Sequence, residues 1–274
     1  DGCGFQQGIA VRLAEIWVYP IKSCHGISLQ ESEVLRTGLR HDRAWMIVRP
    51  DGSMITQREK PELARVQLSL QNEDVMLNAG AFGTLCLKRP ESSAENIMKV
   101  KVWNDEVIAD VEPSKASHDF FSELLQESVL LVTQGASFAR NATEKKVLTE
   151  QPVLFADSHP LLVTTRESLQ DLNSRMSHSI PMSRFRPNLV FEGAVSPYVE
   201  ETVSEILLPD VSLSLRKNCS RCPMITIDQE RGTKESPEPL RTLATYKREG
   251  SKVYFGVHAW SEKGGRVSLG QESQ

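Results

Sequence analysis

The 274-residue sequence lacks the features of several protein classes. No apolar run approaches the roughly 20 residues that a membrane-spanning helix needs. Positive charge is not in excess, because 36 Asp and Glu residues outweigh 32 Lys and Arg residues. This balance argues against nucleic acid as a partner. The five cysteines are odd in number and widely scattered, which does not match a disulfide framework and indicates a reducing compartment.

Two redox motifs are also missing. The sequence contains no cysteine run of the C-x4-C-x2-C type, which argues against a plant-type iron–sulfur cluster. It contains no G-x-G-x-x-G that opens a strand-to-helix unit, which argues against a dinucleotide-binding domain. Any redox role of this chain therefore requires electrons from a separate protein.

Short strand patterns dominate the sequence. Alternating or β-branched segments predict strands at residues 12–21, 44–48, 66–70, 84–87, 100–103, 161–164, 188–192, 205–208, 211–215, 224–227, 253–256 and 266–269. A P-D-G-S turn at 50–53 suggests a hairpin between the strands at 44–48 and 66–70. Helices are predicted at 116–126 and at 239–248. A third helix is predicted to begin at the capping box formed by Thr164 and Glu167. The pattern predicts a β-rich α+β protein that contains a barrel.

A polar stretch divides the chain into two parts. Residues 134–151 read QGASFARNATEKKVLTEQ, which we interpret as a surface connection. It separates an N-terminal domain at 11–133 from a C-terminal domain at 152–271. The length suffices for two modest domains that share a core.

The segment K-N-C-S-R-C-P-M-I-T-I-D at 217–228 leaves several readings open for Cys219 and Cys222. A structural zinc site usually needs a second cysteine or histidine pair, which this sequence lacks. A thioredoxin-like pair needs a following helix, whereas residues 224–227 read as a strand. Both cysteines could also be small apolar core residues.

Three segments rich in hydrogen-bond donors favour a binding site over a core role. Residues 216–222 hold three cations and no acid, residues 183–188 form a second cluster without acids, and residues 20–26 run from a strand into a donor-rich loop. Lys, Arg, Ser and Asn side chains are typical of phosphate and heterocycle sites. If these segments converge, they form an anion pocket that contains a thiolate, and nearby cations favour ligation of a metal by that thiolate.

Four motifs in order along the chain resemble one known family. They are Y-P-I-K-S-C-x-G at 19–26, H-D-R-x-W at 41–45, R-F-R-P-N at 184–188 and C-S-R-C at 219–222. Together they are similar to the MOSC-domain molybdenum-cofactor proteins, closest to the group of the mitochondrial amidoxime reducing component and its bacterial relatives. The resemblance extends from about residue 13 to about residue 270. It implies a MOSC-type β-barrel with a smaller, α/β domain of the MOSC N-terminal type and the cofactor in the cleft between them.

The resemblance also implies a set of site residues. Cys222 would be the protein ligand of molybdenum, and Asp157 and His159 would be the nearest proton donors. The residues expected to hold the anionic molybdopterin cofactor are Lys22, Ser23, Arg43, Asp157, Ser158, His159, Arg186, Asn188, Ser220, Arg221 and Cys222. Cys219 is expected in the wall of the site rather than as a ligand.

The implied reaction is the reduction of N-hydroxylated compounds such as amidoximes, hydroxylamines and hydroxamic acids, by oxo transfer at the Cys-ligated metal. The electrons would come from a separate partner, either cytochrome b5 with its flavin reductase or a bacterial flavin or iron–sulfur protein. We expect a monomer in a reducing intracellular compartment. That compartment is the cytoplasm for a bacterial protein, or the mitochondrial membrane surface for a eukaryotic form whose N-terminal anchor has been removed.

Two other functions are consistent with the sequence. Residues 138–142 and 224–229 resemble the C-terminal domain of a molybdenum cofactor sulfurase, which binds the cofactor without reducing substrates. A plain interaction module is the alternative from another class, and it predicts that both cysteines belong to the core and that no molybdenum is bound.

Overall fold

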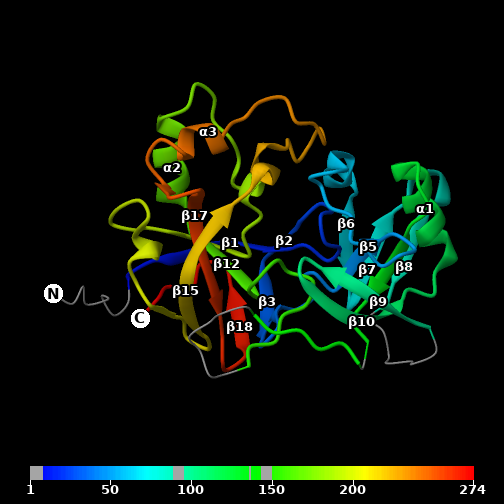
Figure 1. The fold of residues 1–274 in the computed structure, drawn as a ribbon. Coiled ribbons are helices and arrows are strands. Elements are labelled where there is room, and N and C mark those ends of the chain that lie inside the picture. The colour runs from blue at the N-terminus through cyan, green and yellow to red at the C-terminus, as the bar shows by residue number, and fades with distance from the viewer. Residues whose placement is uncertain (1–8, 89–95, 136, 143–149) are drawn as a thin grey trace.

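The computed structural model describes residues 9–88, 96–135, 137–142 and 150–274 (Figure 1). Strands dominate these ranges and the helices are few and short, so the predicted β-rich α+β class is confirmed. None of the helices in these ranges has both the length and the apolar character that a membrane crossing requires.

The largest sheet has eight strands and combines both ends of the chain. Its main path runs in the order β14-β15-β17-β12-β13-β1-β2, and β16 pairs with β17. The strands are β1 (Arg12–Val18), β2 (Ile27–Leu29), β12 (Leu161–Thr165), β13 (Leu189–Glu192), β14 (Glu205–Leu207), β15 (Ser212–Arg221), β16 (Arg248–Glu249) and β17 (Lys252–Trp260).

Three smaller sheets complete the β-structure. The first has the order β5-β11-β10-β9, the second β18-β3-β4 and the third β6-β7-β8. Their strands are β3 (Glu31–Leu35), β4 (Gly38–Leu39), β5 (Trp45–Val48), β6 (Leu68–Gln71), β7 (Asp74–Asn78), β8 (Thr84–Leu87), β9 (Ile97–Val102), β10 (Asp105–Val111), β11 (Leu130–Thr133) and β18 (Gly265–Ser268).

The helices lie outside the sheets (Figure 1). The α-helices are α1 (Lys115–Leu125), α2 (Arg166–Ser174) and α3 (Leu240–Leu243). The 3-10 helices are η1 (Pro61–Arg65), η2 (Gly80–Phe82), η3 (Met182–Phe185), η4 (Val199–Glu201) and η5 (Pro223–Thr226). In Figure 1, α2 and α3 lie at the upper end of the large sheet, whereas α1 lies beside β5–β8.

Strands from the two halves of the sequence pair with each other. β1 is antiparallel to β13, and β3 is antiparallel to β18. Buried apolar residues from β1 and β3 therefore share one core with residues from β12, β15 and β18. This pairing places the loop that follows β1 beside the segments that precede β12 and β13.

The first two predicted helices form close to the expected positions. α1 begins after Ser114, whose side chain accepts a hydrogen bond from the Ser117 amide, and it buries Phe121 and Leu125. The cap predicted for α2 is wrong by one residue, because Thr165 caps the helix by accepting from the Ser168 amide at 3.2 Å. Thr164 instead remains in β12, where it is buried.

One strand prediction and the partner expected in one hairpin are wrong. Residues 224–227 form the 3-10 turn η5 because Pro223 fixes the first helical position and Thr226 Oγ1 donates to the Pro223 carbonyl at 2.7 Å. The 50–53 turn forms, with the Gly52 amide donating to the Arg49 carbonyl at 2.9 Å. The turn closes a short hairpin, in which Val48 of β5 pairs antiparallel with Met54, but β5 pairs with β11 on its other side and not with β6.

Two further segments differ from their predicted extent. The helix expected at 239–248 is only α3, one turn long. β15 continues past residue 215 to Arg221, so the basic cluster lies within a strand. Its pairing with β17 shifts register between Leu215 and Lys217 and again between Asn218 and Ser220.

An aromatic stack supports the segment that carries Arg186. The rings of Phe185 and Phe255 lie 3.9 Å apart between centroids, at an angle of 21°. Both side chains are buried, Phe185 at the end of η3 and Phe255 in β17. The stack thus fixes the residue before Arg186 against the large sheet.

We expect Phe255→Ala to lower the free energy of unfolding by about 3–5 kcal/mol, because it removes a buried ring and leaves a cavity. Phe255→Leu, which keeps most of the apolar volume, should cost about 1 kcal/mol. Urea denaturation measures both, with the exposed Val195→Ala as the control. A loss in Phe255→Ala no larger than that of the control would contradict this role.

Candidate functional site

One cavity of about 330 Å³ brings together the predicted site residues. It is bordered by the loop after β1, the segments before β12 and β13, and the end of β15. All eleven predicted residues line it: Lys22, Ser23, Arg43, Asp157, Ser158, His159, Arg186, Asn188, Ser220, Arg221 and Cys222. The roles assigned to these residues remain predictions.

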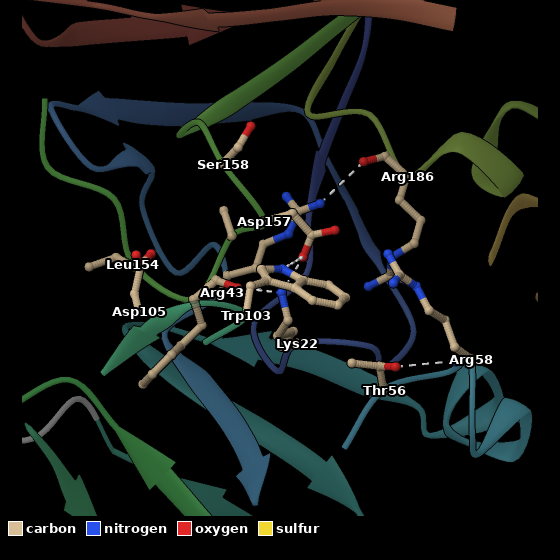
Figure 2. Close-up of polar contacts among 12 residues, drawn as sticks. Lys22, Arg43, Thr56, Arg58, Trp103, Asp105, Leu154, Asp157, Ser158 and Arg186 are labelled. Carbon is tan, nitrogen blue, oxygen red and sulfur yellow. Dashed lines mark hydrogen bonds and ion pairs between the residues drawn. The ribbon is translucent and has the colours of Figure 1, made fainter. Parts of the chain in front are cut away.

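An ion pair between the buried Lys22 and the partly exposed Asp157 lies at the centre of the site (Figure 2). The Lys22 ammonium donates to Asp157 Oδ1 and, at 2.7 Å, to the Phe155 carbonyl. The Lys22 side chain is 7% exposed and the Asp157 side chain 45% exposed, and the cavity lining includes both. The pair therefore joins the two halves of the sequence and still presents a carboxylate to the cavity.

The environment shifts the pKa of both partners. Burial lowers the pKa of Lys22, and the Asp157 charge opposes that shift. For Asp157 burial raises the pKa, but the charge and hydrogen bond of Lys22 and the bond from Trp103 together hold it well below its ordinary value of 3.8. Asp157 is therefore ionised at neutral pH.

Two residues that the sequence analysis missed cover this pair. Trp103, in the turn between β9 and β10, donates from Nε1 to Asp157 Oδ1 at 3.2 Å. The Arg58 guanidinium carbon lies 4.2 Å from the centroid of the Trp103 ring. Both residues line the cavity (Figure 2). Sequence patterns placed Trp103 only at the end of the strand predicted at 100–103, and Arg58 had no signal.

Two arginines share one aromatic ring. The guanidinium carbons of Arg43 and Arg186 lie 4.4 and 4.1 Å from the centroid of the Tyr19 ring. Arg43 also donates to the Arg186 carbonyl at 3.2 Å and to Asp42 at 2.6 Å. Burial lowers the pKa of Arg186 to about 10, which still leaves its guanidinium charged at neutral pH.

Asn188 organises the wall of the cavity. Its Oδ1 accepts from the Leu162 amide at 3.1 Å and from Arg43 at 3.2 Å, and its Nδ2 donates to the Trp17 carbonyl at 3.2 Å. The side-chain amide of Asn188 therefore holds β1, β12 and Arg43 together. The same residue borders the cavity.

Arg221 and the two cysteines form another part of the wall. Arg221 donates to Cys219 Sγ at 3.0 Å and to the Phe185 carbonyl at 2.7 Å. Its Nε is buried and has no hydrogen-bond partner in the described structure. Cys222 directly precedes η5, is partly exposed and has a free thiol. Cys222 is therefore available to a ligand in the cavity rather than packed in an apolar core.

Ser158 links two stacked histidines. Its Oγ lies 2.9 Å from His159 Nδ1 and 3.3 Å from His258 Nε2, and the two rings are 4.8 Å apart between centroids. Burial, reinforced by the charges of Lys217 and Arg221, lowers the pKa of His258 to about 3. His258 is therefore neutral at pH 7.

Arg140 corrects the interpretation of residues 134–151 as surface. Its side chain is only 3% exposed and donates to the carbonyls of Leu154 at 2.8 Å, Ala156 at 2.5 Å and Asp157 at 2.9 Å. Its Nε also pairs with Asp105 at 2.7 Å. Arg140 thus fixes the backbone that carries Asp157. Part of the segment, residues 136 and 143–149, lies outside the described residues.

The lining of the cavity suits an anionic ligand that carries a metal able to bind a cysteine sulfur. Among the described residues that line it, five are cationic and only Asp157 is acidic; the cations are Lys22, Arg43, Arg58, Arg186 and Arg221. The described side chains contain no cluster of three or more His, Cys, Asp or Glu residues arranged to hold a metal. A metal at Cys222 would therefore take its other ligands from a cofactor or solvent.

We expect Asp157→Asn to destabilise the protein, because it leaves the buried Lys22 ammonium without its counter-charge. Allowing for the partial exposure of Asp157, the loss at pH 7 should be about 1–2 kcal/mol. The folded-state pKa of Asp157 is depressed, so its stabilising contribution is complete well above 3.8 and is lost as the pH falls through the folded-state value. Urea denaturation between pH 7 and pH 3 should show the difference shrinking at low pH.

The matched control for this prediction is the double variant Lys22→Met/Asp157→Asn, which removes both charges. It should recover part of the stability lost in the single variant. A difference between wild type and Asp157→Asn that stays constant down to pH 3 would contradict the proposed ion-pair contribution.

Comparison with known proteins places this geometry in a family. Residues 10–128 match the MOSC N-terminal beta barrel domain and residues 150–274 match the MOSC domain. The chain is 32% identical over 273 residues to mitochondrial amidoxime-reducing component 1 of Mus musculus, covering 94% of this chain and 80% of that protein. It is 31% identical over 275 residues to mitochondrial amidoxime reducing component 2 of Rattus norvegicus, covering 94% and 81%.

A second group of relatives carries a different name. The chain is 29% identical over 274 residues to the molybdenum cofactor sulfurase of Oryza sativa subsp. japonica, covering 90% of this chain but 32% of that much longer protein. The resemblance inferred from the four sequence motifs is thereby confirmed. The chain belongs to the MOSC family, with a MOSC N-terminal beta barrel domain followed by a MOSC domain.

Proposed function

We propose that this protein is a molybdenum-cofactor-dependent reductase of N-hydroxylated compounds, with the cofactor in the cavity and Cys222 as its protein ligand. The observation that carries the proposal is a partly exposed cysteine thiol in a cavity lined by five cations and one acid. The similarity to two amidoxime-reducing components supports the reductase reaction.

The residues of the cavity fit an anionic pterin cofactor. Lys22, Arg43, Arg186 and Arg221 would offset its negative charge, and the buried Arg221 Nε offers a donor that no described group uses. The thiolate form of a cysteine is the form that binds a metal. When bound, the molybdenum cofactor supplies the two-electron chemistry by which an N-hydroxylated compound loses its oxygen as water.

The protein's own groups would orient the substrate and move protons. Asp157 is ionised at neutral pH, so in a proton relay it would accept a proton before it donates one. Its carboxylate also holds the Lys22 ammonium beside the cavity. His159 and His258 share the Ser158 hydroxyl, which forms a short hydrogen-bonded path along one wall. We assign proton transfer to Asp157 and His159 in this proposal.

The electrons would come from a separate protein. The sequence carries neither an iron–sulfur cysteine run nor a dinucleotide-binding glycine motif. The four cysteines within the described ranges are free thiols, in keeping with a reducing compartment. A cytochrome b5 with its flavin reductase, or a bacterial flavin or iron–sulfur protein, fits this requirement.

Molybdenum content and turnover together test the proposal. The protein, produced in cells that make the cofactor, should contain about one molybdenum atom per chain and reduce benzamidoxime with a chemical reductant. Cys222→Ala should lower that reduction by at least about 100-fold, because the thiolate ligand is lost. Cys86→Ala, an exposed cysteine outside the cavity lining, is the matched control. A protein purified without molybdenum would refute the proposal.

A cofactor carrier is the second function with specific support. The match to a molybdenum cofactor sulfurase covers 90% of this chain. A carrier would contain molybdenum that depends on Cys222 but would not reduce benzamidoxime or hydroxylaminopurine. The same two measurements therefore separate the carrier from the reductase.

A further inference from the structure

Trp103 occupies a backbone position that its side chain does not favour. Val102 pairs with Asp105, so Trp103 and Asn104 form the two-residue turn between β9 and β10. Trp103 has φ of 58°, in the left-handed region that Gly and Asn adopt more readily than bulky residues. The residue is also 37% exposed. Neither turn geometry nor burial in a core accounts for a tryptophan at this position, and strained residues of this kind cluster at functional sites.

The strained turn brings the indole to the cavity. Trp103 Nε1 donates to Asp157 Oδ1 at 3.2 Å, which fixes the orientation of the ring next to the central ion pair. The Lys22 ammonium lies 5.7 Å from the ring centroid. Figure 2 shows the indole meeting Lys22 and Asp157 in the middle of the site. Trp103 is thus the aromatic side chain that the N-terminal half contributes to the lining.

Arg58 extends this surface. Its guanidinium carbon lies 4.2 Å from the Trp103 ring centroid, and its side chain is exposed and lines the cavity. In the described ranges no carboxylate forms an ion pair with Arg58. Its guanidinium is therefore held by stacking on Trp103. The N–H edges of the guanidinium and its other face remain available to a ligand. We call the two side chains the Arg58–Trp103 platform.

We propose that the Arg58–Trp103 platform determines substrate specificity by stacking on a planar conjugated group, so that aryl or heteroaryl N-hydroxylated compounds bind better than small aliphatic ones. A planar cation and an indole both attract the faces or edges of aromatic rings. The platform adjoins Asp157 and so lies beside the polar centre of the cavity. The reaction rests on the proposed function, whereas the preference for planar ligands rests on the platform itself.

Steady-state kinetics with benzamidoxime and acetamidoxime test this preference in the cofactor-loaded protein. Trp103→Ala should raise KM for benzamidoxime about tenfold, with a smaller effect on kcat, and change KM for acetamidoxime by less than about twofold. Trp103→Phe should keep most of the preference, because it retains a ring but loses the bond to Asp157. Equal losses with both substrates would overturn the proposal, since they would show that Trp103 acts only through Asp157.

Arg58 variants separate planarity from charge. Arg58→Lys keeps the positive charge but not the planar group, so it should reduce the preference for benzamidoxime as much as Arg58→Ala does. Arg266→Ala removes an exposed arginine that does not line the cavity and is the matched control. An unchanged ratio of kcat/KM values in both Arg58 variants would overturn the role of Arg58.

Binding without turnover keeps this test independent of the proposed reaction. Ligand-observed NMR should show wild type binding the unreactive amide benzamide about tenfold more tightly than Trp103→Ala does, with no such difference for acetamide. If wild type reduces neither amidoxime but shows this binding difference, the proposed function fails and the platform stands. If benzamide binds wild type and Trp103→Ala equally, the platform is refuted whatever the turnover.

A stability measurement excludes a purely structural role. Trp103→Asn places a residue that tolerates the left-handed region in the same turn. Its melting temperature should equal or exceed that of wild type, because the backbone strain is relieved. A marked fall in melting temperature would show that the tryptophan is present for stability and would overturn the proposal.

Discussion

The rest of the site depends on how the buried Lys22 ammonium is stabilised. A buried cation is costly unless it is paired and hydrogen-bonded, and here Asp157 and the Phe155 carbonyl meet that requirement. Lys22 follows β1, whereas both partners precede β12, so one interaction connects the first strand with the start of the C-terminal half. Arg140 then holds the backbone of this segment from a third part of the chain.

Among the other cations of the cavity, Arg43 forms an ion pair with the buried Asp42, whereas Arg186 and Arg221 contact no carboxylate of the described residues. Arg43 and Arg186 share the Tyr19 ring, and Arg221 uses a thiol and a main-chain carbonyl. Such contacts position the guanidinium groups and leave their charges little neutralised. Like charges in one cavity oppose folding, so the arrangement costs stability when no anion is present. It also means that an incoming anion meets donors that are already in place.

Much of the strand content could be predicted because it depends on local sequence, and the residues that line the cavity were named through the family resemblance of four motifs. Alternation of apolar residues identified β1, β12 and β13, and the motif segments lie next to these strands. The failures have physical causes. Residues 224–227 resemble a strand in sequence, but Pro223 starts a 3-10 helix there. The N-cap of α2 is Thr165 and not the predicted Thr164. Arg140 was taken for a surface residue, because a polar stretch does not reveal that its arginine is buried against carbonyls.

The sequence by itself determined which side chains are available for chemistry: a cysteine flanked by cations, donor-rich loops next to strands and no second electron-carrying motif. Only the tertiary structure decided that these groups share one cavity, that Asp157 is ionised against Lys22, and that Trp103 and Arg58 border them. The reason is that burial and electrostatic interactions act between residues that are far apart in the chain. Their energies depend on distances that the fold sets and that no local pattern encodes.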